Sequence, residues 1–578
     1  MVKKNIYVLG ISYPTYLSGA CIFKNNKLLY SSTEERFSRI KNDNSFPINS
    51  IKECLKFANI EILDLEKITL NWNPYHGVVT RLYNTVSKNF LSIGNIIFGS
   101  TKSSNISTWI KIKNIHKNFS KYFKVKNSYI KKKIYYCDHH TSHIYSSYYF
   151  SGFGQSLALS IDGAGESATS VLGYFKKNNF YKLNEVHYPH SLGFFYSTIT
   201  QFLGFQPDNH EYKVMGMAAY GKTYLKEKMD KIISINNDMF KLNLDYFSFY
   251  KNKSNSNFYS KKFVNLFGEP KKKQQKFTQY HFDLAYSFQK KFEEIVSEIV
   301  FKAVKKTKIR KLTLSGGCGL NGLANANLVY NKIIDDIFIP PWTQDSGGSI
   351  GSAISYLTKK NIKNYKKLSN DYLGKEYSNN EILMFAKKNK IDLKFSKDIS
   401  KKAAESLKKN KIIIWFQGRS EMGPRALGNR SFLANPFHER IKDKINLVIK
   451  KREHFRPFAP SLINKNKFFV KNISNSNFMN TVLKIKKKYL NKFNAVIHID
   501  GTARVHEVNK KSNPKFFKLI KYFKKISGYP IVLNTSLNLK EEPIVENPNQ
   551  AFKIFKTSKV DGIFIGDFYC IKNDLSKV

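Results

Sequence analysis

Three histidines fall within five positions in the stretch CDHHTSH, residues 137–143. His139 and His143 are four residues apart, so on a helix both imidazoles would lie on one face, which is the spacing that a shared metal ion needs. In most proteins, however, two histidines at this spacing form an ordinary surface or core pair. The histidines alone therefore leave both interpretations open.

Carboxylates at two other places favour the metal. Asp162 ends the apolar run LALSIDGAG, which predicts a buried strand, and Asp345 begins a glycine-rich turn in PPWTQDSGGS. Two histidines with one or two carboxylates and no thiolate suit iron(II), manganese or zinc with open coordination positions better than a closed structural zinc site. We therefore predict a metal site, on condition that the fold brings these residues together.

A duplicated pattern predicts the cleft in which they would meet. NIYVLGISY, a polar loop, GACIF, an Asn-Asn turn and KLLYSS are followed about 150 residues later by LALSIDGAG, a loop, ATSVLGYF, a Lys-Asn-Asn turn and FYKLNEV. Each half predicts a strand, a functional loop and a hairpin. Phosphate-binding folds of the actin and sugar-kinase type contain such a duplication, with the loop after the first strand of each lobe in a shared cleft. We therefore expect Ser12 and Asp162 to lie close together.

Two glycine-rich strand ends favour a nucleotide in the same cleft. Apolar residues at helical spacing predict a core helix from Phe282 to Ala303, and KLTLSGGCGLNGLANANL then reads as strand, turn and helix. Glycines in such turns let backbone N–H groups approach an anion, although the arrangement is common without a ligand. The candidates for nucleotide contact are Gly316, Gly317 and Asn321 in the first turn and Gly347 and Gly348 in the second.

Arginines gather in the second half of a chain whose other cations are mostly lysines. The stretches WFQGRSEMGPRALGNRSF and KKREHFRPF contain Arg419, Arg425, Arg430, Arg452 and Arg456. Arginine suits bidentate capture of phosphate or carboxylate, so the cluster predicts an anionic substrate. Single members, Arg419 and Arg456 above all, could instead cap carbonyl groups. Two later strand-like runs end in small polar residues that could satisfy turns or orient a ligand, namely Thr502, Asn534, Thr535, Ser536 and Asn538.

Length and composition predict two α/β domains. A chain of 578 residues is longer than one hydrophobic core normally organises. Its hydrophobic content of 42% argues against disorder. The aperiodic stretch KKNIKNYKKLSNDYLGKE, rich in Lys and Asn, places a boundary near residue 365, giving domains 1–365 and 366–578.

The charge and the cysteine content limit which partners and which cellular compartment are expected. The formal net charge of +53 comes from lysines spread along the whole chain, so a nucleic-acid partner is not expected. The densest basic run, Lys111 to Lys133, is interpreted as a solvated insertion rather than a binding surface. Five widely spaced cysteines, no signal peptide and no apolar run long enough to span a bilayer predict a cytoplasmic protein.

The chain resembles the carbamoyltransferases of the NodU/CmcH type, which include nodulation-factor and tobramycin carbamoyltransferases. The similar stretches are EERFSRIKNDNSFP, HHTSH, SIDGAGES, SLGFFYSTITQFLGF, EYKVMGMAAYG, SGGCGLNGLAN, GRSEMGPRALGNRSFLANP, KKREHFRPFAP, HIDGTARV and NTSLNLKEEPIV. The resemblance implies an ASKHA-type N-terminal domain with duplicated ribonuclease-H-like lobes and a YrdC-like C-terminal domain. It also implies that carbamoyl phosphate and ATP with Mg²⁺ form carbamoyl adenylate, from which the carbamoyl group moves to a hydroxyl or amino acceptor.

The resemblance assigns roles to individual positions. It implies that His139, His143, Asp162 and Asp345 are metal ligands, with Fe²⁺ the expected ion. Lys450 and Arg452 are similar to the KxR motif of YrdC-type nucleotide sites, and Ser536 and Asn538 to their SxN motif. Arg425, Arg430, Thr502 and Arg504 would lie nearby, and the expected catalytic residues are Arg425, Arg430, Lys450, Arg452 and Asp162. Further candidates for substrate contact, for which a salt bridge is an equal alternative, are Glu34, Arg36, Glu211 and Lys213.

Several positions depart from the family pattern. Tyr16 and Leu17 stand where the family has a His-Asp pair, whose histidine is a candidate base, and a neutral tyrosine is a poor base near pH 7. Asn435, His506 and Glu541 replace Asp, Gln and Gly. Two rival functions stay open at this point: a tRNA-modifying carbamoyl transferase, and a scaffold that has lost transfer activity.

Overall fold

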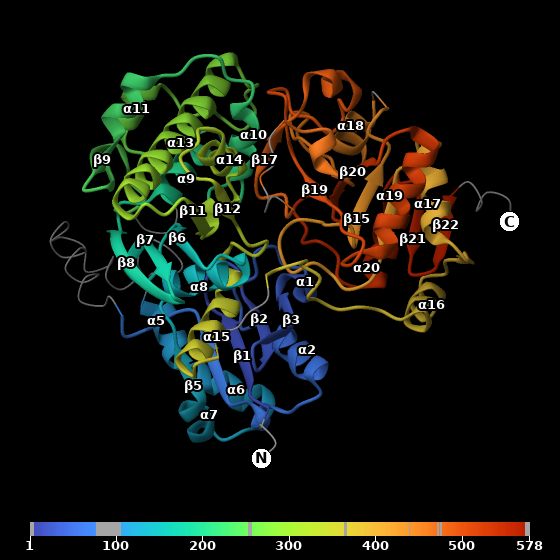
Figure 1. Cartoon of the computed structure of the whole chain (residues 1–578), viewed down its shortest axis with the longest axis horizontal. Helices are drawn as coiled ribbons and strands as arrows, with labels where there is room; N and C mark the ends of the chain where they lie inside the picture. The colour runs from blue at the N-terminus through green and yellow to red at the C-terminus, as the bar shows by residue number, and fades with distance from the viewer. Residues whose placement is uncertain are drawn as a thin grey trace. The chain divides into compact units, whose positions relative to one another are not determined.

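The computed structural model describes residues 5–76, 106–251, 257–362, 367–438, 440–470, 473 and 477–572. The chain is mixed α/β and divides into two compact units (Figure 1), one of Met1–Glu34 with Asp43–Lys367 and one of Glu35–Asn42 with Leu368–Val578. The sequence did not predict that Glu35–Asn42 belongs to the second unit, and the boundary expected near residue 365 lies outside the described residues. No helix in the described part of the chain is long and apolar enough to cross a membrane.

The first unit contains two five-stranded sheets with the same strand order. In each sheet the first strand pairs antiparallel with the second and parallel with the fourth, and it lies at the centre. The duplication predicted from the sequence is therefore present. In sheet order the strands are β3 (Lys27–Thr33), β2 (Gly19–Lys24), β1 (Tyr7–Ser12), β4 (Lys67–Leu70) and β5 (Ile134–Tyr136), then β8 (Asn179–His187), β7 (Ala168–Lys176), β6 (Gln155–Ile161), β11 (Lys311–Ser315) and β12 (Asp336–Phe338).

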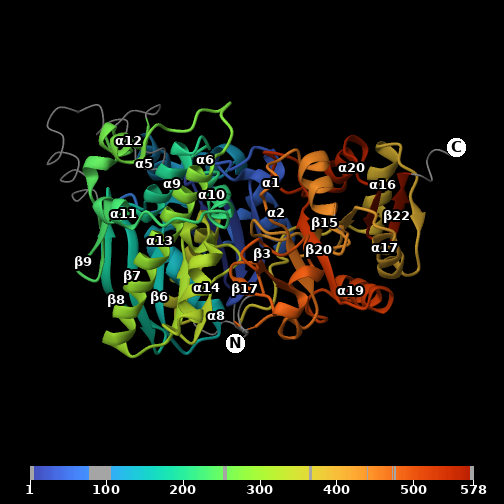
Figure 2. The same cartoon turned by 90° about the horizontal axis from the view of Figure 1, so that it is seen from above.

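The predicted hairpins follow from turn residues with left-handed backbone. Asn25 has a φ of 53° between β2 and β3, and Lys177 and Asn178 have φ values of 51° and 61° between β7 and β8. Positive φ at these positions produces the turn twist that matches two antiparallel strands. In Figure 2, β6, β7 and β8 can be followed side by side.

Two helices that each follow one sheet and cover the other pack against each other. α8 (His139–Ser151) follows the last strand of the first sheet but packs on β6 and β11 of the second. α15 (Gly348–Lys359) follows the second sheet but packs on β1 and β4 of the first. This exchange places α8 and α15 side by side (Figure 1), and with them the starts of both helices.

The other helices of the first unit pack on the two sheets or on one another. The predicted core helix is longer than expected: α13 spans Gln279–Thr307, while its buried apolar residues run from Leu284 to Ala303. The remaining ones are α2 (Ile48–Ala58), α5 (Ile106–Lys113), α6 (Ile115–Phe123), α7 (Asn127–Lys133), α9 (Leu192–Phe202), α10 (Glu211–Ala218), α11 (Lys226–Ile232), α12 (Lys261–Phe267) and α14 (Gly322–Tyr330), with a small hairpin of β9 (Ile233–Asn236) and β10 (Met239–Leu242).

The interpretation of the basic run as a solvated insertion was wrong. Residues 111–133 form α6 and α7 and the end of α5, and Ile112, Ile115, Phe119 and Ile130 are fully buried in the core of the first sheet. Lysines occupy the outer faces of these helices, where their stems cover apolar surface while the charges stay in water. The run is therefore an amphipathic helical layer.

The second unit is built on one mixed eight-stranded sheet. α17 (Ile399–Lys408) and α19 (Pro514–Ser527) pack against each other over a core that includes Trp415 and Phe516. In sheet order the strands are β13 (Lys394–Phe395), β22 (Phe568–Ile571), β21 (Gly562–Ile565), β14 (Ile413–Phe416), β15 (Arg430–Ala434), β20 (Ile531–Ser536), β16 (Ala459–Leu462) and β19 (His506–Glu507). The unit also contains α1 (Glu35–Ser38), α16 (Asn379–Lys388), α18 (Ile441–Asp443), α20 (Pro548–Thr557) and the ribbon of β17 (Val482–Lys484) and β18 (Thr502–Arg504).

Candidate functional site

Two imidazoles and two carboxylates converge in the first unit. His139 and His143 lie on the first turns of α8, Asp162 directly follows β6, and Asp345 begins the turn that leads into α15. One ligand atom from each lies within 4.8 Å of all the others. The Nε2 atom of His143 is 3.0 Å from Asp162 Oδ2 and 3.8 Å from Asp345 Oδ1, and Nε2 of His139 is 3.5 and 3.9 Å from the same two atoms.

The chemistry of this quartet fits a divalent metal. The histidine Nε2 atoms and Asp162 Oδ2 are buried, yet they make no well-directed hydrogen bond to a described residue. Their separations are those of ligands about 2.1 Å from one shared ion. Although burial opposes it, the two carboxylates raise the pKa of His143 to about 9, and the two histidines hold the pKa of Asp162 well below its usual range. Two nitrogens and two oxygens without a thiolate are a donor set that iron(II), manganese or zinc accepts.

Backbone groups hold both carboxylates in place. Asp162 Oδ1 accepts the N–H of Gly163 at 2.7 Å, and Asp345 Oδ2 accepts the N–H of Tyr16 at 2.9 Å. The hydroxyl of Ser12 donates to the carbonyl of Asp345 at 2.9 Å, so the carboxyl end of β1 does reach this site as expected. The Tyr16 hydroxyl donates to Asn209 Oδ1 at 2.9 Å, which shows the direction of the ring that replaces the family histidine.

Two acidic residues that the sequence reasoning missed orient the histidine helix. Asp138 caps α8 by accepting the Thr141 N–H at 2.9 Å, and Glu166 accepts the His139 N–H at 3.1 Å. With His76, whose Nδ1 is 2.5 Å from Asp138 Oδ2, they form a second group of close potential ligands. Their signal was present in the sequence, because Asp138 precedes the histidines and Glu166 follows Asp162 by four residues.

Steric contact explains several glycines of the predicted nucleotide turns. Gly316 has a φ of +87°, and a Cβ there would lie 2.2 Å from the Ile161 carbonyl oxygen. A Cβ on Gly347 would lie 1.9 Å from the carbonyl oxygen of Trp342, and one on Gly348 would lie 2.3 Å from Asn71 Nδ2. Each of these glycines is thus required by packing, whatever ligand the turns contact.

Gly317 and Asn321 complete the first turn. A Cβ on Gly317 would lie 3.1 Å from Asp162 Oδ1, so this glycine borders the metal quartet. Asn321 caps α14 through its Oδ1, which accepts the Ala324 N–H at 3.2 Å, and it also bonds with Gln289. The amide of Asn321 therefore has a structural partner on each side.

The four remaining candidates make separate contacts, three in the first unit and one in the second. Glu34 caps α2, since both its oxygens accept bonds from Asn49 and Ser50. Glu211 begins α10, and burial together with the nearby charge of Asp208 raises its pKa to about 7. Lys213 is buried, with its ammonium 5.3 Å from the centre of the Phe205 ring. Arg36 belongs to the second unit, where it donates to the carbonyls of Glu421 and Gly423, each at 3.0 Å.

Positive side chains gather in the second unit. Burial and the charges of Arg425, Arg456 and Arg452 lower the pKa of Arg504 well below its usual range. Burial and the charges of Arg452 and Arg456 likewise lower the pKa of Lys450. Neither Lys450 nor Arg504 forms an ion pair with any residue that the structure describes. We call Arg425, Lys450, Arg452, Arg456 and Arg504 the cationic cluster.

The two motifs of the predicted nucleotide site lie together at this cluster. The Lys450 ammonium donates to the carbonyl oxygen of Ser536 at 2.7 Å and to Asn538 Oδ1 at 3.0 Å. Arg452 Nε donates to Asn446 Oδ1 at 2.7 Å, and its guanidinium carbon lies 4.7 Å from the centre of the Phe458 ring. The neutral oxygens around Lys450 position the ammonium but leave its charge uncompensated.

Arg430 differs from the prediction of a catalytic residue. Its guanidinium is fully buried and donates to the carbonyls of Gln417, Gly418 and Lys375 at 2.7 to 3.1 Å. Since these bonds commit the guanidinium to the backbone, Arg430 supports the loop that precedes it. Arg419 caps the carbonyls of Leu373 and Gly374, which is the alternative that the sequence left open for it.

Thr502 and Asn534 are also engaged with protein atoms. The Thr502 hydroxyl donates to Asp500 Oδ1 at 2.8 Å, and Asn534 Nδ2 donates to Ser461 Oγ at 2.8 Å and to the carbonyl of Ala426 at 3.0 Å. Thr502 therefore holds a turn two residues before Arg504. Asn534 holds the carbonyl of Ala426, the residue that follows Arg425.

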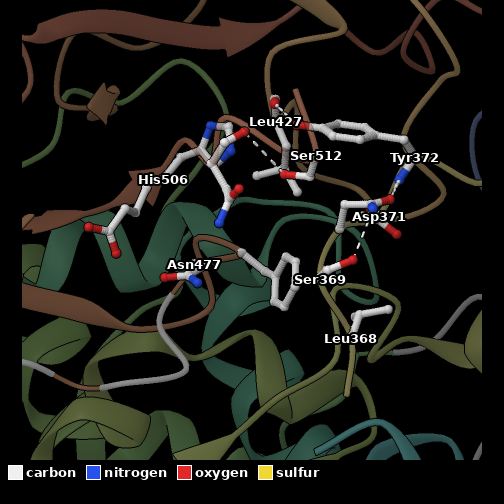
Figure 3. Close-up of a pocket in the computed structure, with 12 residues that line it drawn as sticks. Leu368, Ser369, Asp371, Tyr372, Leu427, Asn477, His506 and Ser512 are labelled. Atoms are coloured by element: carbon white, nitrogen blue, oxygen red, sulfur yellow. Dashed lines mark hydrogen bonds between the residues drawn. The ribbon is translucent and has the colours of Figure 1, made fainter. Parts of the chain in front are cut away.

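A cavity of about 200 Å³ also lies in the second unit (Figure 3). Its walls come from the chain around Asp371, the loop at Leu427, the strand end at His506 and the loop before α19. The lining residues are Leu368, Ser369, Asn370, Asp371, Tyr372, Leu427, Asn477, Phe478, His506, Glu507, Asn509 and Ser512. From the sequence, His506 was singled out only as a departure from the family pattern, and the cavity was not predicted.

Comparison with known proteins identifies the family. Models described as Carbamoyltransferase N-terminus and Carbamoyltransferase C-terminus match residues 7–354 and 404–572. Nodulation protein NolNO of Sinorhizobium fredii is 31% identical over 577 residues, which cover 96% of this chain and 79% of the relative. The 3'-hydroxymethylcephem-O-carbamoyltransferase of Streptomyces clavuligerus is 31% identical over 258 residues, 44% of this chain and 48% of the relative. The crystal structure of T. kodakarensis HypF covers 62% of this chain and 49% of its own, with 11% identity and a TM-score of 0.36. The chain therefore belongs to the carbamoyltransferase family and is an enzyme that transfers a carbamoyl group to an acceptor.

Proposed function

We propose that the enzyme makes carbamoyl adenylate from carbamoyl phosphate and ATP and transfers its carbamoyl group to a hydroxyl or amino group of a small-molecule or glycan acceptor. The observation that carries this proposal is the cationic cluster of the second unit. A family relative whose name describes O-carbamoylation of a hydroxymethyl group supports a hydroxyl acceptor.

The cluster is costly unless an anion binds it. Burial and neighbouring positive charges both lower the pKa values of Arg504 and Lys450, which means that the folded protein pays in stability to keep these groups charged. A polyphosphate or a carbamoyl phosphate would compensate those charges through charge-assisted hydrogen bonds. The arrangement is therefore suited to ligands that carry several negative charges.

Adenylate formation would proceed in this second unit, which we propose to be YrdC-like. Water releases inorganic phosphate from carbamoyl phosphate, and an oxygen of the resulting carbamate attacks the α-phosphorus of ATP, so that pyrophosphate leaves. Arg425, Lys450, Arg452 and Arg504 would bind the phosphate oxygens and stabilise the charge that develops on them. Mg²⁺ accompanies ATP as its usual counter-ion.

Carbamoyl transfer would take place in the first unit, which we propose to be of the ASKHA type. His139, His143, Asp162 and Asp345 would hold Fe²⁺ or another divalent ion, which supplies a Lewis acid for the adenylate phosphate. The N–H of Tyr16 and the hydroxyl of Ser12 keep Asp345 in position. The acceptor oxygen or nitrogen would attack the carbamoyl carbon and lose its proton to water, and AMP would leave as the bond between that carbon and the phosphate oxygen breaks.

Pyrophosphate release tests the adenylation half. We expect release from ATP and Mg²⁺ to depend on carbamoyl phosphate and to fall by about a hundredfold in Arg504→Ala, the loss typical of one donor to a developing charge. Arg440→Ala is the matched control, because Arg440 is an exposed residue of the same unit. Pyrophosphate release by this variant should match that of the wild type. Release that needs no carbamoyl phosphate, or that survives Arg504→Ala unchanged, would contradict the proposal.

A further inference from the structure

Carbamoyl transfer in the first unit needs a group that receives the proton of the acceptor. Tyr16 stands at the position of the family histidine, but its hydroxyl donates to Asn209 Oδ1 at 2.9 Å, so it is not placed to accept a proton. His140 is also engaged, because its two ring nitrogens bond with the Ser160 hydroxyl at 2.8 Å and the Ala168 carbonyl at 3.0 Å. A base must therefore come from another element of this unit.

Glu211, the first residue of α10, has one oriented and one available carboxylate oxygen. Its Oε1 accepts the Ser197 hydroxyl at 2.8 Å and the Asp208 N–H at 2.7 Å. No described residue donates a hydrogen bond to its Oε2, and the side chain is partly exposed. The two bonds to Oε1 thus fix the carboxyl group, while Oε2 stays open to a ligand.

The helix α9 extends from the metal quartet to Glu211. Its N-cap residue, Ser191, donates its hydroxyl to the carbonyl of Gly163 at 2.8 Å, directly after Asp162. Ser197, which bonds to Glu211, lies six residues further along the helix, a rise of about 9 Å. Figure 1 shows α9 and α10 packed together. A separation of this order leaves room for a phosphate ester at the quartet and an acceptor beside Glu211, since a base contacts the group that it deprotonates at about 3 Å.

Two further contacts connect Glu211 with the quartet. Tyr16 bonds to a carboxylate of the quartet through its N–H and, through its hydroxyl, to Asn209, two residues before Glu211. Cys318 lies in the turn before α14, and burial together with the charges of Asp162 and Glu211 raises the pKa of its thiol well above the usual range. Both carboxyl groups therefore lie near this one thiol.

The ionisation of Glu211 suits a base that works near neutral pH. Burial and the charge of Asp208 raise the pKa of Glu211 to about 7, close to the value at which a carboxylate both is present and binds a proton well. The other ionisable groups that face this carboxyl are Tyr196 of α9 and Cys318. Burial raises the pKa values of both well above their usual range, so both are neutral near pH 7.

We propose that Glu211 is the general base of carbamoyl transfer and receives the proton of the acceptor hydroxyl on its Oε2. The inference rests on the proposed function and adds to it the residue through which that proton reaches water. As the proton passes to the carboxylate, the acceptor oxygen forms its bond to the carbamoyl carbon. The bond from that carbon to the phosphate oxygen breaks, and its electron pair leaves with AMP. The carboxylic acid then returns the proton to water.

Nucleophiles that differ in their need for a base test this role. The full chain is supplied with ATP, Mg²⁺ and carbamoyl phosphate, and AMP formation is followed with water, glycerol or hydroxylamine as the nucleophile. With water and glycerol we expect the wild-type rate to rise with pH and to level off above about pH 7. Glu211→Gln should lower this rate by about a hundredfold or more and abolish its pH dependence. Hydroxylamine attacks before it loses a proton, so its rate should stay within about twofold, as should pyrophosphate release in a single turnover.

Two neighbouring variants separate proton transfer from a structural effect. Asp208→Asn should move the pH dependence to lower pH, because the charge that raises the pKa of Glu211 is lost. His210→Gln removes the imidazole next to Glu211 and should match the wild type. The inference would be overturned by unchanged AMP formation in folded Glu211→Gln, by an equal loss with hydroxylamine, by an equal loss in His210→Gln, or by a wild type that forms no AMP with water or glycerol. Absence of pyrophosphate release from the wild type would instead contradict the proposed function.

Discussion

Glu211 is a carboxyl group that the fold prefers in its protonated form. Its Oε1 accepts the Ser197 hydroxyl at 2.8 Å and the Asp208 N–H at 2.7 Å, and burial with the charge of Asp208 raises its pKa to about 7. Since the unfolded carboxyl ionises near pH 4.5, the stability that the protonated form contributes is complete below that pH. It is lost as the pH rises towards 7 and stays lost above it.

Glu211→Gln should remove this pH dependence. The free energy of unfolding of the variant minus that of the wild type should be more positive at pH 8 than at pH 5, by up to about 3 kcal/mol, as thermal unfolding at the two pH values would show. Asp208→Asn serves as the partner variant, because loss of the neighbouring charge should move the transition of the wild-type carboxyl to lower pH. An effect of Glu211→Gln that is the same at both pH values would contradict the assignment.

Single site residues were predictable from the sequence where the type of side chain itself indicates the chemistry, as it does for metal ligands. His139, His143, Asp162 and Asp345 were chosen because they are metal-ligand types at strand and helix ends, and the structure brings their ligand atoms within 4.8 Å. Arg430 was chosen on the same kind of reasoning, yet its guanidinium bonds to carbonyls. A sequence does not show whether an arginine near a glycine-rich loop faces a ligand or the loop itself, because that depends on where the carbonyls of the loop point.

The loop between Glu421 and Arg430 is held by one buried carboxylate. Glu421 Oε1 accepts the N–H groups of Leu427, Asn429 and Arg430 at 2.7, 2.9 and 3.4 Å. Arg425 lies in the segment between Glu421 and Leu427. Three donors on one oxygen fix the path of the loop, so Glu421 positions a member of the cationic cluster without belonging to it.

Glu421→Ala should therefore impair both stability and anion binding. The buried N–H groups would lose their acceptor, which costs roughly 3 kcal/mol or more in the free energy of unfolding, and tripolyphosphate should bind at least about tenfold more weakly. Glu421→Gln keeps an acceptor oxygen at this position and should recover most of the tripolyphosphate affinity. Equal affinity in Glu421→Ala and the wild type would show that the loop keeps its shape without the carboxylate.

Among the elements, those with a local sequence pattern were predicted correctly more often than the packing of the elements on one another. The hairpins, the strand before Asp162 and the core helix α13 followed from turn residues and periodicity. The exchange of α8 and α15 between the two sheets had no local signal, because it depends on which sheet each helix covers. The helices at residues 111–133 were missed for another reason: their lysines concealed the buried stripe of Ile112, Ile115 and Phe119.

At the scale of the whole molecule, each unit contains one set of groups suited to a different half of the reaction. The first holds two imidazoles and two carboxylates, and the second holds the five side chains of the cationic cluster, with neutral oxygens around the Lys450 ammonium. A metal ion needs the first donor set and a polyphosphate the second. If the halves are divided in this way, substitutions in one unit should leave the ligand of the other unit bound.

Removal of the metal ligands tests that division. His143→Ala and Asp345→Asn should lower the bound divalent metal from roughly one ion per chain to a small fraction of it, because each removes a ligand from a four-donor site. Carbamoyl-phosphate-dependent release of pyrophosphate should stay within about twofold of the wild type, since that step would use the second unit. His187→Ala is the control, as His187 is a partly exposed histidine of the first unit outside the quartet, and it should retain the metal. Metal content by mass spectrometry and pyrophosphate by a coupled assay give two independent readouts on the same samples. If pyrophosphate release falls in step with metal content, the metal acts in adenylate formation, and the assignment of one half-reaction to each unit is wrong.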